Sequence, residues 1–314
     1  MQERRNDRNA RLRARIAEDK ILQVPGAYDG LSAKLVEHAG AEAVYLSGSG
    51  VAASLGLPDL GLVSFTEMLE RANQIAEVVC IPVVTDGDTG YGGPLNVVRT
   101  VRAYEKVGVS AIQIEDQVFP KRCGHFEAKQ VIPLEEMLAK IYAALDARWD
   151  ENFLIIARTD ARATHGLEEA IRRGHAFAEA GADIVFVEAP QSREELARIA
   201  QEIDAPLLVN LPEGGKTPLL TAQQLEHLGY DMVIHANTAL RAAAKQMLHV
   251  LRYLLKHGTS QGIVDQLITF EDRDELTGLP ELQARETAYT RAAGLEQEEQ
   301  GKRERGKQGK GMSS

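Results

Sequence analysis

The sequence contains little cysteine and no long apolar run. Its 314 residues include two cysteines, Cys80 and Cys123, and their different surroundings give no sign of a disulfide framework. No stretch of about 18 consecutive apolar residues is present, as a membrane-spanning helix would require. The N-terminal segment is charged and lacks the apolar centre of a signal peptide. We therefore expect a cytoplasmic protein that does not bind a membrane.

The sequence also has fewer basic than acidic residues, 36 Lys and Arg against 46 Asp and Glu. The formal net charge of −10 gives a surface that repels nucleic acid and anionic membranes, so small molecules are the expected partners. The sequence lacks the G-x-G-x-x-G pattern and the lysine of a P-loop, so nucleotide binding is not indicated. With 44% hydrophobic and 26% charged residues, the composition is that of a soluble globular protein with a large core.

Short apolar segments alternate along the chain with segments of helical periodicity. The segments predicted as strands are ILQVP, AVYLSG, IPVVTD, AIQIED, FLIIARTD, IVFVEA, APLLVN and MVIHAN. This alternation predicts parallel strands joined by helices, and eight such units favour a (β/α)8 TIM-type barrel. Extra C-terminal helices are predicted after the last strand, where they cover the barrel or pack on a neighbouring subunit. We expect one barrel domain over residues 1–293, with an N-terminal helical arm, and a disordered tail over residues 294–314.

Nearly every predicted strand ends in a polar group. Since catalytic groups of these barrels lie at the carboxyl ends of the strands, the site is expected there. The strand-end residues are Ser47, Gly48, Ser49, Asp86, Asp88, Glu115, Asp116, Arg158, Asp160, Glu188 and Asn210. Their spread over consecutive strands favours a barrel over an open sheet, which gathers its ligand contacts at one switch point.

Three of these residues predict a metal site. Asp86 and Asp88 stand two residues apart at one strand end, and Glu115 ends the next strand. An oxygen-only set of three carboxylates suits a hard divalent cation, so we expect Mg²⁺, with Mn²⁺ as a substitute. The alternative is that the Asp86–Asp88 turn is a polar loop that caps the next helix. No His or Cys stands nearby at zinc spacing, which argues against zinc.

The two cysteines differ in their sequence surroundings. Cys123 lies in the stretch KRCGH, and the positive charge of Lys121, Arg122 and His125 favours its thiolate. Cys123 is therefore predicted to be reactive, although most cysteines are small buried hydrophobic residues. Cys80 lies in the apolar run EVVCIPVV and is predicted to be buried and structural.

Arg158 follows a very apolar strand. A guanidinium held there suits a substrate carboxylate, and the alternative is a salt bridge to Glu188 or Asp160. The small residues at 47–50 offer backbone N–H groups as a cradle for a carboxylate or phosphate, a weak signal when taken alone. A divalent cation, an arginine and a thiol of low pKa together suit chemistry in which an enolate of pyruvate is made or consumed.

The chain from Val24 to about Thr259 resembles the isocitrate lyase and phosphoenolpyruvate mutase superfamily. The resemblance is carried in order by VPGAYDGLSAKL, YLSGSGVAASLGLPDLG, VVTDGDTGYGG, IEDQVFPKRCGH, ARTDARATHGLEEAI, FVEAP and NLPEGGKTP. Within the superfamily the sequence is most similar to the branch of 2-methylisocitrate and 2,3-dimethylmalate lyases and carboxyphosphonoenolpyruvate mutases. Phe126 and the EGGKTP run look more like the dimethylmalate and alkylmalate lyases, the oxaloacetate lyases and these mutases.

The resemblance implies a role for each site residue. Substrate binding is implied for Tyr45, Ser47, Gly48, Ser49, Gly124, Arg158 and Asn210. Catalytic roles are implied for Cys123, Lys121, His125, Arg158 and Glu188. Metal binding is implied for Asp86, Asp88 and Glu115, with Asp59 supporting the water shell of the metal. The cysteine of KRCGH marks the lyase branch, in which it returns a proton to the carbon of the departing dicarboxylate.

The expected function is that of a Mg²⁺-dependent carbon–carbon lyase. It would cleave a 2-hydroxy dicarboxylate, or a substrate of the 2-alkylmalate or methylisocitrate type, to a 2-oxo acid and a carboxylate through an enolate. Alternatives within the superfamily are carboxyvinyl-carboxyphosphonate phosphorylmutase and oxaloacetate hydrolase or decarboxylase. The phosphoenolpyruvate mutases replace the lyase cysteine, so Cys123 favours carbon–carbon cleavage.

Two further expectations concern assembly and activity. Relatives form homotetramers by exchanging a C-terminal helix, and the apolar positions beyond the eighth predicted strand fit the same arrangement here. A different class of function is a catalytically idle barrel that acts as an oligomeric binding protein. The intact Asp86 and Asp88 argue against this class, because idle relatives usually lose their metal carboxylates.

Overall fold

The structure, a computed structural model, describes residues 2–122 and 129–295. Contacts between residues divide the chain into two compact units, Met1–Arg252 and Tyr253–Ser314. The tail predicted from residue 294 lies outside the described residues from residue 296 onward, so its disorder stays a prediction. Within the described ranges, no helix is both long enough and apolar enough to cross a membrane.

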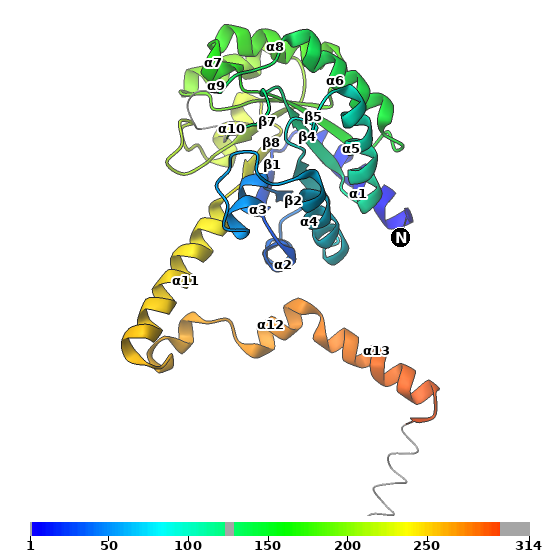
Figure 1. Ribbon diagram of the computed structural model, residues 1–314, viewed down its shortest axis with the longest axis vertical. Helices are drawn as coiled ribbons and strands as arrows, with labels where there is room; N and C mark the ends of the chain where they lie inside the picture. Colours follow the sequence, from blue (N-terminus) through cyan, green and yellow to red (C-terminus); the bar gives the residue numbers. More distant parts are fainter. Residues whose placement is uncertain (1, 123–128, 296–314) are drawn as a thin grey trace, which may run out of the picture. The chain divides into compact units, whose positions relative to one another are not determined.

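The first unit is built on a closed barrel of eight parallel strands (Figure 1). The barrel closes where β1 pairs with β8, with Leu22 opposite Met232 and Val24 opposite Ile234. The strands are β1 (Leu22–Ala27), β2 (Val44–Leu46), β3 (Val83–Asp86), β4 (Ala111–Glu115), β5 (Leu154–Thr159), β6 (Ile184–Val187), β7 (Leu207–Asn210) and β8 (Met232–His235). The predicted (β/α)8 fold class is confirmed.

Helices alternate with the strands and surround the barrel. They are α1 (Gln2–Ile16), α2 (Gly30–His38), α3 (Gly48–Ser54), α4 (Phe65–Val78), α5 (Pro94–Val107), α6 (Leu134–Ala147), α7 (Ala161–Thr164), α8 (Leu167–Glu179), α9 (Arg193–Glu202), α10 (Ala222–Leu228) and α11 (Thr238–His257), which continues into the second unit. Local sequence sets several of their ends. Ser64 and Glu67 form a reciprocal capping box at the start of α4. Helix α5 begins at Pro94 and is capped after Val107 by Gly108, whose φ of 94° suits glycine.

The sequence analysis does not predict the short helices α3 and α7. Helix α3 is rich in glycine and serine, which are weak helix formers, and its start depends on a cap. The Ser47 hydroxyl provides that cap by accepting the N–H of Gly50 at 3.1 Å. Of the backbone N–H groups offered by residues 47–50, the one of Gly50 is therefore already used inside the protein.

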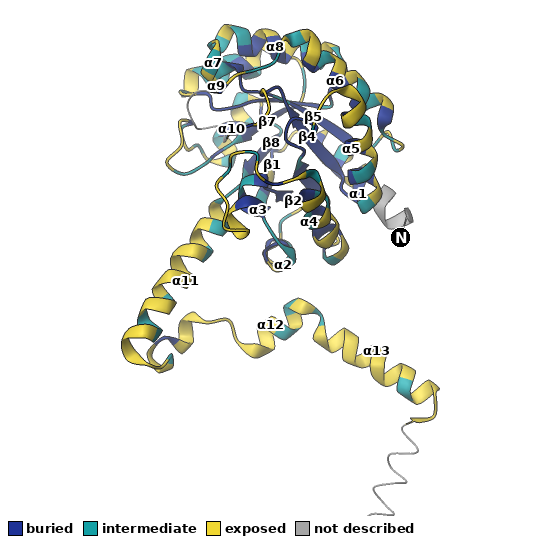
Figure 2. Cartoon of the chain, viewed as in Figure 1, coloured by how far each residue is buried: buried dark blue, intermediate teal, exposed yellow. Residues whose placement is uncertain are grey.

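The core has two layers, one inside the barrel and one between the barrel and its helices (Figure 2). Side chains inside the barrel include Tyr45, Val84, Ile156, Phe186 and Met232, and all are buried. The outer layer contains the other faces of the same strands and the apolar faces of α4, α5, α6 and α8. Parallel strands covered on both faces read as continuous apolar runs, which explains why the strands were predictable.

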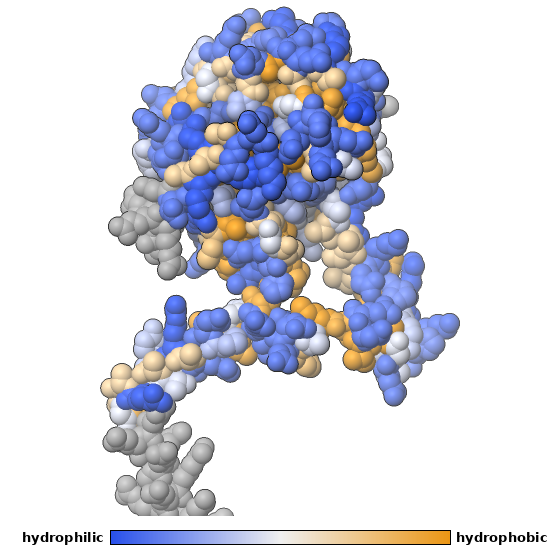
Figure 3. Space-filling view, turned by 180° about the vertical axis from the view of Figure 1, so that it is seen from behind, coloured by the Kyte–Doolittle hydropathy of each residue, from blue (hydrophilic) through white to orange (hydrophobic). Residues whose placement is uncertain are grey.

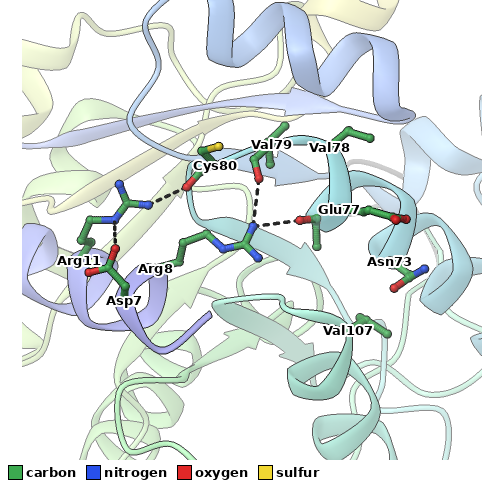
Figure 4. Close-up of a pocket in the computed structure, with 10 residues that line it drawn as sticks. Asp7, Arg8, Arg11, Asn73, Glu77, Val78, Val79, Cys80 and Val107 are labelled. Carbon is green, nitrogen blue, oxygen red and sulfur yellow. Dashed lines mark hydrogen bonds and ion pairs between the residues drawn. The ribbon is translucent and has the colours of Figure 1, made fainter. Parts of the chain in front are cut away.

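Helix α1 packs against the side chains inside the barrel, at the end of the barrel where the strands begin. Its Leu12 and Ile16 are buried in this layer together with Leu22 of β1. Figure 4 shows the polar side of this contact, where Arg8 donates to the carbonyl of Val79 at 3.2 Å and Arg11 to that of Cys80 at 2.6 Å. Arg8 also donates to the carbonyl of Ala76 at 3.0 Å, so it occupies carbonyls at the end of α4 that the helix itself leaves without partners. A cavity of about 710 Å³ lies beside these two arginines.

The prediction that Cys80 is buried is wrong. Cys80 is exposed, whereas its neighbour Val79 is buried in the outer layer. Helix α4 ends at Val78, and Val79 has extended backbone angles of φ −113° and ψ 156°. Successive residues of an extended segment point to opposite sides, so the apolar run directs Val79 inward and Cys80 outward.

The second unit, from Tyr253 onward, is helical where it is described. It contains the end of α11, the 3₁₀ helix η1 (Gln261–Gln266), α12 (Phe270–Thr277) and α13 (Leu279–Ala292), so the predicted C-terminal helices are confirmed. Helices α12 and α13 contain no buried residue (Figure 2). Apolar side chains are exposed along this unit (Figure 3), and the large ones include Leu255, Val264, Leu267, Ile268, Phe270, Leu282 and Tyr289.

Candidate active site

The carboxyl ends of the strands surround a cavity of about 120 Å³. Most of the residues predicted from the strand ends line it, together with neighbours that the sequence analysis did not single out. The lining residues are Tyr45, Ser47, Ser49, Asp59, Asp86, Glu115, Lys121, Arg122, Arg158, Phe186, Glu188, Asn210, Pro212, Ile234, Ala236 and Asn237. Gly48 and Asp88 line a narrow adjoining cavity, which Asp59 and Lys121 also border.

Asp86 is held by three donors at the end of β3. One carboxylate oxygen accepts the Tyr45 hydroxyl at 2.5 Å and the Gln113 amide at 2.8 Å, and the other accepts the N–H of Gly48 at 2.7 Å. Burial, followed by the charge of Asp86, raises the pKa of Tyr45 well above its ordinary value, so the phenol stays a donor. Gln113 lies two residues before Glu115 in β4, so both side chains point to the same face of the strand. This spacing was the signal that could have identified Gln113.

Lys121 forms ion pairs with two acids beside the cavity, Asp59 and Asp88. Its ammonium lies 2.7 Å from Asp59 and 3.1 Å from Asp88, and all three side chains are nearly buried. Burial alone would lower the pKa of Lys121, but Asp88 and Glu115 raise it well above its ordinary value. Burial raises the pKa of Asp88 despite the nearby ammonium. Lys121 is therefore a charged group set among acids that it partly neutralises.

Arg158 lies among three acidic side chains at the end of β5. Asp160 accepts its Nε at 2.9 Å and its Nη2 at 3.2 Å, and Glu115 and Glu188 lie at 3.4 and 3.7 Å from the guanidinium. The salt bridges to Asp160 and Glu188, given above as the alternative to substrate binding, are therefore present. They do not consume the arginine, because Arg158 also lines the cavity. Burial raises the pKa of Glu115 well above its ordinary value, with Arg158 opposing the shift.

Asn237, which the sequence analysis missed, lies beside the serine turn. Its amide is 3.4 Å from both the Ser47 and the Ser49 hydroxyl groups. Asn237 ends the MVIHAN segment, so its position after a strand was the available signal. On the neighbouring strand end, Asn210 Oδ1 is buried and has no hydrogen-bond partner among the described residues. Both amides are thus placed to meet a polar ligand.

The structure describes the first two residues of KRCGH, Lys121 and Arg122. Cys123, Gly124 and His125 lie outside the described residues, so their predicted roles stay predictions. The start of the stretch is fixed, since the Gln117 side chain donates to the carbonyl of Arg122 at 2.8 Å and accepts its N–H at 2.9 Å. Lys121 and Arg122 both line the cavity, and the stretch therefore begins at its edge.

Whether these residues fit a divalent cation can be judged from their oxygens. Within the described ranges, no group of three or more His, Cys, Asp or Glu side chains is arranged to hold a metal ion. Even so, Glu115 Oε1 is buried without a hydrogen-bond partner there. A Cβ at Gly48 would lie 3.3 Å from Asp86 Oδ2 and 3.6 Å from Asp88 Oδ1, so both carboxylates border one small space. These oxygen donors fit Mg²⁺ better than a softer metal.

The lining of the cavity also includes four apolar residues, Phe186, Pro212, Ile234 and Ala236. A cavity lined by both charged and apolar groups suits a small carboxylic acid with an alkyl substituent.

Comparison with known proteins agrees with this geometry. The family described as phosphoenolpyruvate phosphomutase matches residues 12–255. The chain is 45% identical over 281 residues to 2,3-dimethylmalate lyase of Eubacterium barkeri, covering 89% of this chain and 97% of that one. It is 45% identical over 282 residues to 2-methylisocitrate lyase of Aeropyrum pernix, covering 90% and 91%.

A solved structure of 2,3-dimethylmalate lyase, described as a member of the PEP mutase/isocitrate lyase superfamily, superposes with a TM-score of 0.85 at 36% identity. The match covers 90% of this chain and 95% of that one. Family, relatives and fold coincide over the part of the chain that builds the cavity. The chain therefore belongs to the phosphoenolpyruvate mutase and isocitrate lyase superfamily, as a carbon–carbon lyase.

Proposed function

We propose that the protein is a Mg²⁺-dependent lyase that cleaves a 2-hydroxy dicarboxylate of the 2-alkylmalate or methylisocitrate type. The observation that carries the proposal is the meeting of Asp86, Glu115, Lys121 and Arg158 in one small cavity whose lining also includes apolar residues. The printed names of the relatives, 2,3-dimethylmalate lyase and 2-methylisocitrate lyase, supply the substrate class. The exact substrate is left to the experiment below.

Asp86, Asp88 and Glu115 would hold the Mg²⁺, with Asp59 acting through water. The cation would supply a positive charge that neutralises the buried carboxylates and stabilises negative charge developing on a substrate oxygen. Lys121 keeps Asp59 and Asp88 in place, since its ammonium contacts both. Tyr45 and Gln113 orient Asp86 in the same way from β2 and β4.

The reaction breaks the bond between the carbinol carbon and the neighbouring carbon that bears a carboxylate. The hydroxyl would release its proton to solvent, the carbinol carbon would become the carbonyl of a 2-oxo acid, and the bonding electrons would leave with the other fragment as an enolate, whose protonation at carbon takes up one proton in return. Arg158 would bind the carboxylate of the 2-oxo acid, and Ser47 and Ser49 would bind its oxygens. Glu188 and Asn210 would contact the departing fragment. The Cys123 thiol would protonate that fragment at carbon, with Lys121 and His125 adjusting the thiol pKa.

A substrate panel tests this proposal. Purified protein with Mg²⁺ is assayed on 2,3-dimethylmalate, 2-methylisocitrate, isocitrate and oxaloacetate, with detection of pyruvate, glyoxylate or oxalate. Turnover of an alkylmalate or methylisocitrate supports the proposal. Turnover confined to oxaloacetate assigns the hydrolase or decarboxylase alternative, and rearrangement of a carbon–phosphorus substrate assigns the phosphorylmutase. Failure to bind Mg²⁺ at millimolar concentration together with no turnover would favour the idle binding protein.

The exposed apolar residues of the C-terminal unit support a proposal about assembly. Leu255 and Phe270 are 89% and 78% exposed, and α12 and α13 bury no residue within this chain. Surfaces of this kind mark contacts with other protein chains. We propose a homotetramer in which each chain passes its C-terminal helices to a neighbour. Light scattering at micromolar protein should give four times the monomer mass, and a monomer would refute the proposal.

A further inference from the structure

Asp160 is a fully buried carboxylate that the proposed chemistry does not use. It follows β5, two residues after Arg158, and is 0% exposed. Its Oδ2 accepts Arg158 Nε at 2.9 Å, while its Oδ1 accepts Arg158 Nη2 at 3.2 Å. Two parallel bonds of this kind fix the plane of a guanidinium as well as its position. Asp160 therefore determines how Arg158 is presented to the cavity.

Asp160 has a second cationic partner in Lys129. The Lys129 ammonium lies 2.5 Å from Asp160 Oδ1, and its side chain is 1% exposed. Lys129 follows the KRCGH stretch along the chain and lies beside the pairing of Gln117 with Val131. Burial alone would raise the pKa of Asp160, but Arg158 and Lys129 lower it, which keeps the carboxylate ionised. The ammonium and the guanidinium thus share one carboxylate.

The backbone of Asp160 is also fixed from behind. Asp116 accepts the N–H of Asp160 at 2.9 Å and the Thr159 hydroxyl at 2.7 Å. Arg173 of α8 balances the charge of Asp116, at 2.9 Å. These contacts hold the backbone of Asp160. The direction of the Asp160 side chain then depends on its two cationic partners, Arg158 and Lys129.

Asp160 binds one edge of the Arg158 guanidinium, and the N–H groups on the other edge are left for the cavity. Asp160 takes Nε and one hydrogen of Nη2, whereas Nη1 lies 3.4 Å from Glu115. Without a firm hold by Asp160, Glu115 and Glu188 would draw the guanidinium toward themselves, since both are buried acids within 4 Å of it. A guanidinium bound bidentately by either acid would have fewer N–H groups left for a substrate carboxylate.

We propose that Lys129 and Asp160 are positioning residues that hold the Arg158 guanidinium in the orientation that receives the substrate carboxylate. The ammonium of Lys129 fixes Asp160 Oδ1, and Asp160 in turn fixes the Nε and Nη2 edge of Arg158. This inference rests on the proposed function for the identity of the ligand. The orientation of Arg158 itself can be observed without any turnover.

The experiment compares Lys129→Met, Lys129→Arg and Asp160→Asn with the wild-type protein. Arg162→Met is the matched control. Arg162 lies in α7, between β5 and α8, and makes a bidentate ion pair with Glu195 of α9 instead of with Asp160. Each protein is assayed for kcat and KM on the substrate found by the panel, and for the Kd of oxalate with Mg²⁺ by calorimetry. Oxalate is a planar dianion that resembles the carboxylate and carbonyl end of the 2-oxo acid product, which Arg158 is proposed to bind. Crystal structures of the wild type and the variants locate the Arg158 guanidinium.

For Lys129→Met and Asp160→Asn we expect the oxalate Kd and KM to rise by about 10-fold or more, toward the roughly 100-fold that a 1 Å misplacement can cost. We expect kcat to change less than KM, because Arg158 holds a carboxylate present in both substrate and product. Lys129→Arg should recover most of the affinity, and Arg162→Met should retain it. The guanidinium should turn toward Glu115 or Glu188 in Lys129→Met and Asp160→Asn.

An unmoved guanidinium with unchanged KM and oxalate Kd in these two variants would overturn the inference. If the wild-type protein turns over none of the substrates and binds no oxalate, the proposed function fails. In that case a displaced Arg158 in the variants would still support the positioning role, and an unmoved one would still refute it. If Lys129→Met does not fold, Asp160→Asn, which removes the charge of Asp160 but keeps its shape, decides by the same measurements.

Discussion

Arg173 and Arg172 offer a direct test of how burial sets the value of an ion pair. They are neighbours on α8, and both donate to Glu169. Arg173 also donates to Asp116 at 2.9 Å and to the carbonyl of Ile132 at 3.0 Å. The side chain of Arg173 is 6% exposed and that of Asp116 is 0% exposed, whereas Arg172 is 59% exposed. The same substitution to methionine therefore removes a buried partner in one case and a solvated one in the other.

The expected losses of stability differ several-fold. Removing one partner of a buried pair costs about 3–5 kcal/mol, because the other charge stays buried without compensation. Asp116 keeps the N–H of Asp160 and the Thr159 hydroxyl as donors, so we expect the lower end, about 3 kcal/mol, for Arg173→Met. An exposed pair contributes about 0–1 kcal/mol, which is the expected cost of Arg172→Met.

Thermal unfolding measures the difference. A loss of about 3 kcal/mol should lower the Tm of Arg173→Met by roughly 6–12 °C, while Arg172→Met should change it by less than roughly 4 °C. Both variants are compared at one protein concentration, since assembly would shift the Tm of all of them. Equal losses in the two variants would contradict the reasoning, because only Arg173→Met leaves the buried carboxylate of Asp116 without its cation.

Three other predictions follow from the described contacts and the proposed chemistry. The Arg172 hydrogen bond, followed by that of Arg173, lowers the pKa of Glu169 to about 2 from its ordinary 4.5. The stability that Glu169 contributes is therefore complete above about pH 4.5 and is lost as the pH falls toward 2, so the difference in unfolding free energy between wild type and Glu169→Gln should shrink over that range. Cys123→Ser should keep oxalate and Mg²⁺ binding but lose about 10²–10⁴-fold in turnover, and near-full activity would make the thiol structural. Since Cys80 is exposed, iodoacetamide should label it in the wild-type protein, and mass spectrometry that found Cys80 unmodified after prolonged treatment would contradict this exposure.

Much of the fold was predictable because its signals are local. The strand segment FLIIARTD combines a long apolar run with a polar end, and both features follow from a strand covered on two faces that opens at the barrel mouth. Helix ends such as Gly108 and the Ser64 capping box are equally local. Cys80 was misplaced because its apolar neighbours suggested burial, whereas the extended backbone after α4 turns alternate side chains outward.

The parts of the site that could not be predicted depend on contacts between distant residues. Lys121 meets Asp59 across 62 positions of the sequence, and Tyr45 meets Gln113 across 68. Neither pair follows a spacing rule, because the folded barrel brings together strands and loops that are far apart in the sequence. The sequence analysis gave Lys121 the role of favouring the thiolate of Cys123. The described partners of Lys121 are the carboxylates of Asp59 and Asp88.

The charge balance of the cavity explains why the proposed substrate needs a cation beside it. Among the described residues that line the cavity, Asp59, Asp86, Glu115 and Glu188 are acids and Arg122 is an exposed cation. The other two cations of the lining are Lys121 and Arg158. Each of these cations is already shared with an acid, Lys121 with Asp59 and Arg158 with Asp160. A dicarboxylate that entered this arrangement alone would add two negative charges where acids are already in excess, at a high cost in a medium of low polarity. If Asp86, Asp88 and Glu115 hold a divalent cation as proposed above, its charge would offset that excess.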